Sequence, residues 1–191
     1  MAAGGSQDRL AMAVRECQRL NIEVLPPDIN YSKVNFSIDQ QDDILGIRFG
    51  LAQIKNVGET GIQKLVNERN KNGNFTSIDD FASRINPRDV NKRVVEALAK
   101  SGSLDLFSSR GRIIDSIDRV VQVAQEQFRI RETGQTSMFD LLEGEQALQT
   151  ISLENSEIDE RQLLVWEKEY LGTYLSDHPF QEISTSIRQY V

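Results

Sequence analysis

The segment from Ile54 to Ile62 has the residue types of a tight turn between two short helices. The centre of such a turn needs positive φ, which glycine and asparagine adopt most readily, and Asn56 and Gly58 stand there. Backbone N–H groups at the start of the second helix then lack partners and lie at the positive end of its dipole. The spacing is that of a helix-hairpin-helix, with Asn56 in the place of the usual first glycine.

A DNA phosphate can satisfy those N–H groups, and contact of this kind reads the DNA backbone and not the bases. The first hairpin therefore predicts sequence-independent binding of double-stranded DNA. The alternative is an ordinary helical corner that only packs for stability. The candidate DNA-binding residues of this hairpin and its second helix are Lys55, Asn56, Val57, Gly58 and Lys64.

A second, degenerate hairpin lies between Leu98 and Leu104, before a helix that starts near Arg110. Cations cluster beside it, and two hairpins in tandem could hold phosphates on both sides of a minor groove. A solvated charged face is the alternative. The candidate DNA-binding residues here are Lys92, Arg93, Lys100, Ser101, Gly102, Ser103, Arg110 and Arg112, with Arg84 and Arg88 nearby.

The peptide Gln135-Thr136-Ser137-Met138-Phe139 suggests recognition of a protein. Gln135 offers an amide to a small polar pocket, and Met138 and Phe139 offer two apolar anchors to a hydrophobic cleft. This is the pattern of the short peptide that binds bacterial sliding clamps. The alternative is that Phe139 simply packs onto the protein together with Leu141 and Leu142.

Few residues remain for catalysis or metal binding. Cys17 is the only cysteine and His178 the only histidine, which removes most metal sites and the Ser-His and Cys-His designs. The carboxylate pairs at 42–43 and 79–80 are better explained by a turn and a helix start than by two-metal catalysis. We therefore expect no catalytic residue, no metal ligand and no cofactor in this chain.

The net charge of −7 over 191 residues hides two different regions. Residues 46–131 carry 15 Lys and Arg against 10 Asp and Glu, whereas residues 132–182 carry 2 against 12. The hairpins thus lie in a basic region that suits DNA, although the whole chain is acidic. No stretch approaches the roughly 20 apolar residues of a membrane span, and no leader opens the chain. We expect no membrane partner and no secretion.

Hydrophobic spacing predicts an α+β, predominantly α-helical fold, in which a small β element precedes tandem helix-hairpin-helix units. The expected strands, at 22–25, 35–38 and 44–49, should form an antiparallel element after a helix over 8–20. The expected helices then cover 51–54, 59–69, a short run capped by Thr76 or Ser77, and a run capped by Asn91 that ends at Gly102. One long helix capped by Ser108 or Ser109 follows and ends at Gly134, and the last covers 163–171.

These elements divide into four predicted parts. Residues 1–49 form the β-containing region, and residues 50–131 form the tandem helix-hairpin-helix domain. Residues 132–162 form an acidic loop that carries the clamp-binding peptide, and residues 163–191 form a helical lead-in to another domain.

The motifs in this order resemble the alpha subunit of bacterial DNA polymerase III, a C-family polymerase. Glu16-Cys17-Gln18-Arg19-Leu20 with residues 22–30 resembles the end of that family's fingers region. Residues 47–51 and 54–59 look like its helix-hairpin-helix segment, which 90–94 and Ser101-Gly102 continue.

The resemblance extends over nearly all of 8–180. Gln135 to Phe139 falls where the family keeps an internal clamp-binding motif, and 167–179 resembles the lead-in to its OB-fold domain. Nothing matches the palm domain with the catalytic aspartates. The chain therefore looks like an excised internal fragment that begins at an artificial Met1.

The resemblance implies a non-catalytic part of a DNA-directed DNA polymerase, a nucleotidyltransferase that uses Mg²⁺. This part would bind duplex DNA and tether the enzyme to the sliding clamp during replication, within the polymerase III holoenzyme in the cytoplasm. Three alternatives remain. They are a helix-hairpin-helix accessory protein of DNA repair, a protein-interaction module that does not bind DNA, and an error-prone paralogue of the same family.

Overall fold

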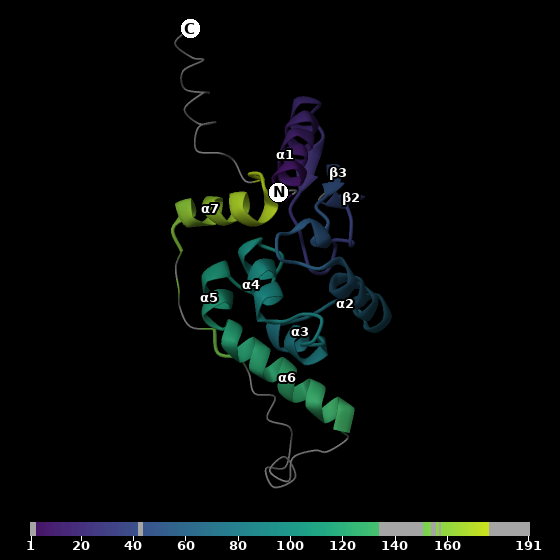
Figure 1. Cartoon of the computed structure of the whole chain (residues 1–191), viewed down its shortest axis with the longest axis vertical. Helices are drawn as coiled ribbons and strands as arrows, with labels where there is room; N and C mark the ends of the chain where they lie inside the picture. Colours follow the sequence, from purple (N-terminus) through teal and green to yellow (C-terminus); the bar gives the residue numbers. More distant parts are fainter. Residues whose placement is uncertain (1–2, 42–43, 134–150, 154–155, 157, 176–191) are drawn as a thin grey trace.

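The chain forms a mostly helical structure with one small sheet. The computed structural model describes residues 3–41, 44–133, 151–153, 156 and 158–175. The sheet and α1 lie at one end, α3 and α6 at the other, and α4 between them (Figure 1). In chain order the elements are α1 (Ala3–Arg19), β1 (Glu23–Leu25), β2 (Ser37–Gln41), β3 (Ile44–Arg48), η1 (Leu51–Gln53), α2 (Glu59–Asn72), α3 (Ile78–Arg84), α4 (Lys92–Lys100), α5 (Arg110–Asp115), α6 (Ile117–Thr133) and α7 (Glu160–Leu171).

The α+β, mainly helical fold class is confirmed, but the purely antiparallel sheet is wrong. The strand order is β1-β3-β2, and β1 runs parallel to β3, with Val24 opposite Ile47. Only β2 and β3 pair antiparallel. The reason is that Pro26-Pro27 ends β1 and the chain travels through 28–36 before β2 begins. A short connection, which favours an antiparallel pair, joins β2 to β3 alone.

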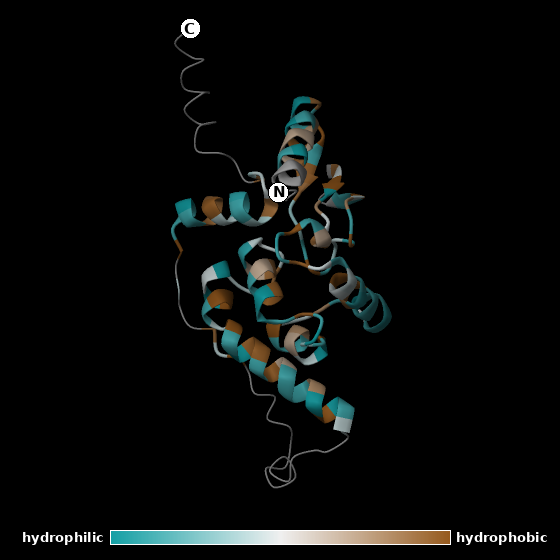
Figure 2. Ribbon diagram, viewed as in Figure 1, coloured by the Kyte–Doolittle hydropathy of each residue, from teal (hydrophilic) through white to brown (hydrophobic). Residues whose placement is uncertain are grey.

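One buried apolar cluster runs through the molecule, and α4 lies at its centre. Val95 and Leu98 of α4 have no exposed surface, and α4 contacts α5, α6 and α7. The cluster also includes Ile29 near the sheet and Leu171 of α7. Figure 2 shows apolar residues interleaved with polar ones along α6, as expected for a helix with one buried side. The division into four parts stays a prediction, since this cluster spans the described portions of several of them. Among the described residues, no helix is long and apolar enough to cross a membrane.

Two predicted helix caps are confirmed. The Ser77 side chain accepts a hydrogen bond from the Asp80 N–H at the start of α3, and Asn91 accepts one from the Val94 N–H at the start of α4. Such caps satisfy N–H groups that the helix itself leaves without partners. Ser109 also occupies the N-cap position of α5, but its side chain makes no capping bond.

The single long helix expected from Ser108 or Ser109 is two helices, α5 and α6, separated at Ser116. The Ser116 N–H lies 3.2 Å from both the Arg112 and the Ile113 carbonyl oxygens, and its hydroxyl donates to the Ile113 carbonyl at 2.9 Å. Serine competes in this way for backbone acceptors and can interrupt a helix whose apolar spacing continues. Periodicity alone did not reveal the break.

A buried arginine fixes α2 to the N-terminal region. Arg69 is 6% exposed, and its guanidinium donates to the carbonyls of Ile29 at 2.7 Å and Ser32 at 2.9 Å. Burial lowers the pKa of Arg69 from its usual value. Because Arg69 is on α2 and both carbonyls are in the loop before β2, these bonds hold the helix and the loop together. Without Arg69, both buried carbonyls would lose a charged donor.

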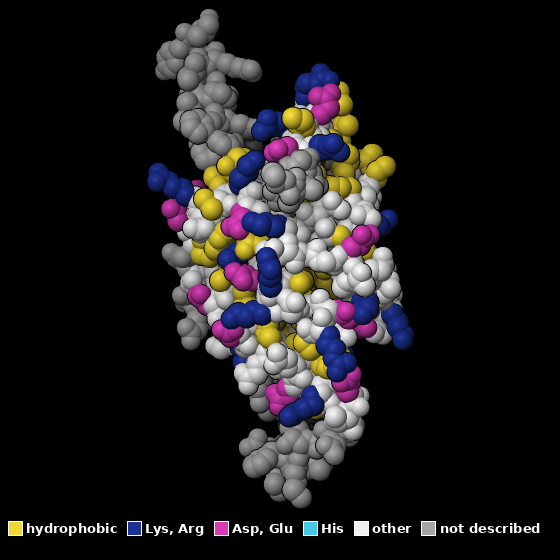
Figure 3. Space-filling view, in the orientation of Figure 1, with side chains coloured by type: hydrophobic (Ala, Val, Ile, Leu, Met, Phe, Trp, Pro, Cys, Tyr) yellow, Lys and Arg dark blue, Asp and Glu magenta, His cyan; other side chains and the backbone are white. Residues whose placement is uncertain are grey.

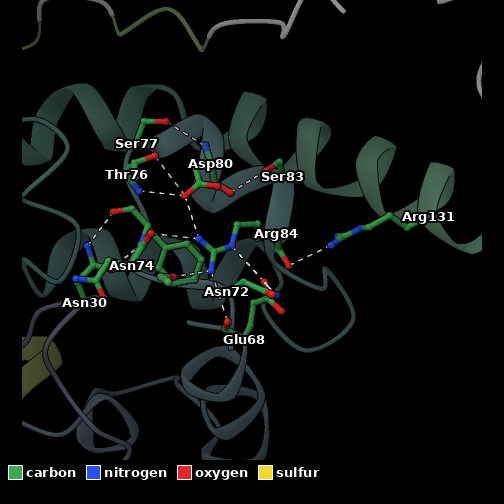
Figure 4. A network of polar contacts seen from close by, with 12 residues as sticks. Asn30, Glu68, Asn72, Asn74, Thr76, Ser77, Asp80, Ser83, Arg84 and Arg131 are labelled. Carbon is green, nitrogen blue, oxygen red and sulfur yellow. Dashed lines mark hydrogen bonds and ion pairs between the residues drawn. The ribbon is translucent and has the colours of Figure 1, made fainter. Parts of the chain in front are cut away.

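A second arginine joins α2 to α3 (Figure 4). Arg84 pairs with Glu68 of α2 at 3.2 Å and with Asp80 of its own helix at 3.1 Å, and it donates to the Gly73 carbonyl at 2.7 Å. Its guanidinium also lies 4.3 Å from the centre of the Phe75 ring. These contacts hold the C-terminal end of α2, so that the hairpin at its other end has a fixed direction.

Glu68→Gln should lower stability at neutral pH by roughly 1 kcal/mol or less, and the deficit should shrink in acid. The Asn72 amide at 2.7 Å, and then Arg84, hold the pKa of Glu68 below its usual value against the opposing effect of burial. The ionised carboxylate therefore stabilises the fold above the unfolded-state pKa of about 4.3, and this contribution disappears as pH falls through the lowered folded-state pKa.

Urea unfolding at a series of pH values between neutrality and about pH 3 measures the effect. Glu23→Gln, at an exposed strand position, is the matched control and should change little at any pH. A Glu68→Gln deficit that stays constant down to the acid end would contradict the ionic contribution.

Candidate nucleic-acid interface

The first hairpin is formed by η1, a turn and α2, as predicted. Asn56 has φ of +69°, so it occupies the left-handed region in place of a glycine. Gly58 does not, since its φ is −86° and its ψ 132°, and it is the N-cap residue of α2. The expectation of positive φ at Gly58 is therefore wrong. A methyl group at Gly58 would meet no atom within 4 Å, so this position faces open space.

The N-terminal turn of α2 has no side-chain cap. Gly58 is exposed and supplies no acceptor side chain for the N–H groups of 59–61, while its own carbonyl accepts from the Ile62 N–H at 3.1 Å. By contrast, α3, α4 and α7 are capped by side chains. The first hairpin thus presents uncapped N–H donors at the positive end of a 14-residue helix, which is the arrangement that binds an anion.

Val57 does not face outward with Gly58. Its side chain is 9% exposed and belongs to the apolar cluster, and its N–H donates to the Ile54 carbonyl at 3.1 Å. Val57 therefore shapes the turn from within. Asn56 links the turn to α4, because its side-chain oxygen accepts from the Arg93 guanidinium at 2.7 Å.

The exposed cations around this hairpin are largely paired with carboxylates of other elements. Lys55 pairs with Glu169 of α7 at 3.1 Å, and Lys64 pairs with Asp89 at 2.7 Å. Lys92 pairs with Asp118 of α6. Figure 3 shows Lys and Arg next to Asp and Glu over much of the visible face. The structure brings Arg93 of α4 beside the first hairpin, where it contacts Asn56, whereas the printed partner of Lys92 lies on α6.

The second hairpin is a buried turn. Ser101 and Ser103 are each 1% exposed, and their hydroxyls hydrogen-bond to each other at 2.8 Å. The Ser103 N–H donates to the Leu98 carbonyl, and its carbonyl accepts from the Ile29 N–H. Gly102 has φ of +85° and lies directly beneath the Arg110 guanidinium. Ser101, Gly102 and Ser103 are therefore buried and bonded internally, and the structure does not bring them to the surface with the first hairpin.

The cations of the second unit also turn inward. Lys100 is half-buried, pairs with Glu96, and lies 5.6 Å from the ring centres of both Trp166 and Tyr170. Arg110 pairs with Asp105 at 2.9 Å and lies 3.9 Å from the buried Glu167. Arg112 is half-buried as well. Lys100 therefore helps to hold α7 against α4, and Arg110 links α5 to α7.

Sequence reasoning missed the part that α7 takes in this site. The spacing of 163–171 predicts the helix but says nothing about where it packs. In the structure the Tyr170 carbonyl accepts a hydrogen bond from the Lys55 N–H at 2.9 Å. The carboxylate partners Asp89, Asp118 and Glu169 were missed for the same reason, since each lies far along the chain from its cation or on another element.

The predicted clamp-binding residues Gln135, Met138 and Phe139 lie outside the described residues. The chain is next described at Ile151, whose side chain is 3% exposed and whose N–H donates to the Asp79 carboxylate at 2.7 Å. Within the described portion, no group of three or more His, Cys, Asp and Glu residues is placed to hold a metal ion.

The chain is similar to two kinds of known sequence. Residues 21–113 match the helix-hairpin-helix motif family. Over 172 residues, or 90% of its length, the chain is 37% identical to the DNA polymerase III subunit alpha of Thermus aquaticus. It is also 33% identical over 96% of its length to the subunit of the same name from Buchnera aphidicola, and 34% identical over 96% to that from Vibrio cholerae. The chain spans only 13% to 16% of the length of these relatives.

Asn56→Val should destabilise the protein by about 1–2 kcal/mol, because a β-branched residue is strained at positive φ and cannot accept from Arg93. Asn56→Gly keeps the backbone conformation and should cost less. Gly58→Ala should cost less than about 1 kcal/mol, since the position is open and its φ is ordinary. Chemical denaturation of the three variants measures these differences. A larger loss for Gly58→Ala than for Asn56→Val would contradict the assigned turn geometry.

Proposed function

The chain belongs to the family of DNA polymerase III alpha subunits, as a segment of them, and we propose that this segment binds duplex DNA and tethers the polymerase to the sliding clamp. It does no chemistry itself in this proposal. The nucleotidyl transfer of DNA replication, with its Mg²⁺, is assigned to parts of a polymerase that lie outside the segment. The segment would act within the polymerase III holoenzyme in the bacterial cytoplasm.

The observation that supports DNA binding best is the uncapped N-terminus of α2 at the exposed Gly58. It lies inside the stretch that matches the helix-hairpin-helix family. The first-turn N–H groups suit a phosphate oxygen in both hydrogen bonding and charge. Lys55 precedes Asn56 in the turn, Arg93 contacts Asn56, and Lys64 lies on α2, so these three cations would contact neighbouring phosphates. Such contacts position the protein without reading bases.

The alternative of a pure protein-interaction module is less well supported. It would be favoured if Val57 and Gly58 were both buried beneath another element. Val57 is buried in the core of the same chain, whereas Gly58 faces open space. A free-standing repair accessory protein is disfavoured by the relatives, since those named above are polymerase III alpha subunits matched over 90% or more of this chain.

The clamp tether is proposed on the pattern of Gln135, Met138 and Phe139. The described residues on either side support a fixed attachment, because Thr133 ends α6 and Ile151 is buried in the core. A clamp-bound peptide and a DNA-bound hairpin on one chain raise each other's effective concentration. Two weak contacts would therefore hold the polymerase on DNA together.

Gly58→Asp should separate DNA binding from folding. An aspartate at the N-cap accepts the first-turn N–H bonds itself, so stability should be unchanged or rise by up to about 1 kcal/mol. The same carboxylate occupies the phosphate position and repels DNA, so duplex affinity should fall about tenfold or more. Duplex binding is measured by fluorescence anisotropy over a salt titration, where the unaltered chain should show a log–log slope of about −3 for three or four phosphates.

The control is Asn70→Asp, which adds the same charge at an exposed position near the other end of α2. It should weaken binding much less. Equal effects of the two variants, or binding by the unaltered chain that does not depend on salt, would reject the phosphate site.

Met138→Ala with Phe139→Ala should abolish binding of the chain to a purified bacterial sliding clamp, because both apolar anchors are removed. Leu141→Ala with Leu142→Ala removes two neighbouring apolar side chains and should leave clamp binding largely intact. Surface plasmon resonance with immobilised clamp makes the measurement. Unchanged binding of the first double variant would reject the clamp tether, and DNA binding should be the same in both.

A further inference from the structure

The C-terminal end of α7 is joined to the first hairpin at Lys55 by two bonds. The Lys55 N–H donates to the Tyr170 carbonyl at 2.9 Å, and the Lys55 ammonium pairs with the Glu169 carboxylate at 3.1 Å. Lys55 immediately precedes Asn56, the residue with positive φ. A helix more than 100 residues further along the chain thus contacts the turn that is proposed to meet DNA.

The position of α7 is well determined by packing, so this is more than a chance pair of surface side chains. Tyr170 and Leu171 are 6% and 2% exposed, and Lys100 of α4 lies against the rings of Tyr170 and Trp166. The helix ends at Gly172, which has the left-handed conformation of a C-cap. Both the carboxylate of Glu169 and the negative end of the α7 dipole therefore lie next to Lys55.

A DNA phosphate at the first hairpin would compete with Glu169 for the same ammonium group. The side chains of Lys55 and Glu169 are 43% and 45% exposed, so water and ions reach the pair and it can exchange partners. The same arrangement recurs at Lys64 with Asp89 and at Lys92 with Asp118. Of these three carboxylates, Glu169 is the one whose helix, α7, also bonds to the hairpin backbone, through the Tyr170 carbonyl and the Lys55 N–H.

From this geometry we infer that Glu169 sets the affinity of the first hairpin for DNA, by occupying Lys55 until a phosphate displaces it. This inference rests on the proposed binding of duplex DNA. Binding then exchanges one anionic partner of Lys55 for another, and the freed carboxylate takes up a cation from solution. The free energy gained per phosphate contact is therefore small. Because the freed carboxylate takes up a cation, binding also releases fewer counterions than the number of phosphate contacts would imply.

Weak, exchangeable contacts suit a protein that must move along DNA. A lysine without a carboxylate partner would bind each phosphate more tightly, and that stronger contact would have to break each time the protein moved along the DNA. Glu169 provides Lys55 with an alternative partner at about the same distance as a phosphate. Movement by one phosphate then breaks one ion pair while forming another.

Glu169→Gln tests the inference directly. The amide keeps the size of the side chain and removes the competing charge, so duplex affinity at low salt should rise about two- to fivefold. The log–log salt slope should also become steeper by about one. The matched control is Glu160→Gln, the same charge change at an exposed position at the other end of α7. It should change affinity little.

A double-mutant cycle with Lys55→Gln shows whether Glu169 acts through Lys55. In the Lys55→Gln background, Glu169→Gln should no longer raise affinity beyond the Glu160→Gln control. Equal effects of Glu169→Gln and Glu160→Gln in the chain that keeps Lys55, or an undiminished effect of Glu169→Gln without Lys55, would overturn the inference. Absence of duplex binding by the unaltered chain would instead overturn the proposed function itself.

Discussion

The guanidinium of Arg69 lies inside the protein with two backbone carbonyls as its partners, and the placement of α2 depends on this contact. A buried charged donor must keep its acceptors, so Ile29, Ser32 and α2 are held together. Arg84 then ties the far end of α2 to α3. The uncapped N-terminus at Gly58 has a defined direction because the rest of its helix is held at these two points.

Near the N-terminus of α2, lysines are paired with carboxylates, so positive charge is not concentrated there. The basic excess of residues 46–131 suggests an open positive surface, but Lys55, Lys64 and Lys92 each have a carboxylate beside them. Arg93 contacts the neutral Asn56 amide. The electrostatic field at the hairpin therefore comes from the Arg93 guanidinium, the helix dipole, the N–H groups and a few exchangeable pairs, and net charge alone is a poor guide to it.

Features that depend on residues close together in the sequence could be predicted, and features that depend on contacts between distant segments could not. Ser77 and Asn91 each cap the N–H group three residues further on, and the positive φ of Asn56 belongs to a single residue. The caps and the left-handed turn are therefore readable from local pattern. The parallel pairing of β1 and the burial of Ser101 and Ser103 depend on distant segments. The pairing of Lys55 with Glu169 has no local signal at all. Similarity to known polymerase subunits identified the family, but long-range contacts decided which predicted residues face solvent.

The burial of Ile151 has a mechanical consequence. Thr133 ends a helix packed on α3, and Ile151 returns to the N-terminal turn of α3 through Asp79. A pulling force on the intervening segment is therefore shared between two attachment points on the same part of the core. Such a force would load α6 and the start of α3 first, because both attachment points are there.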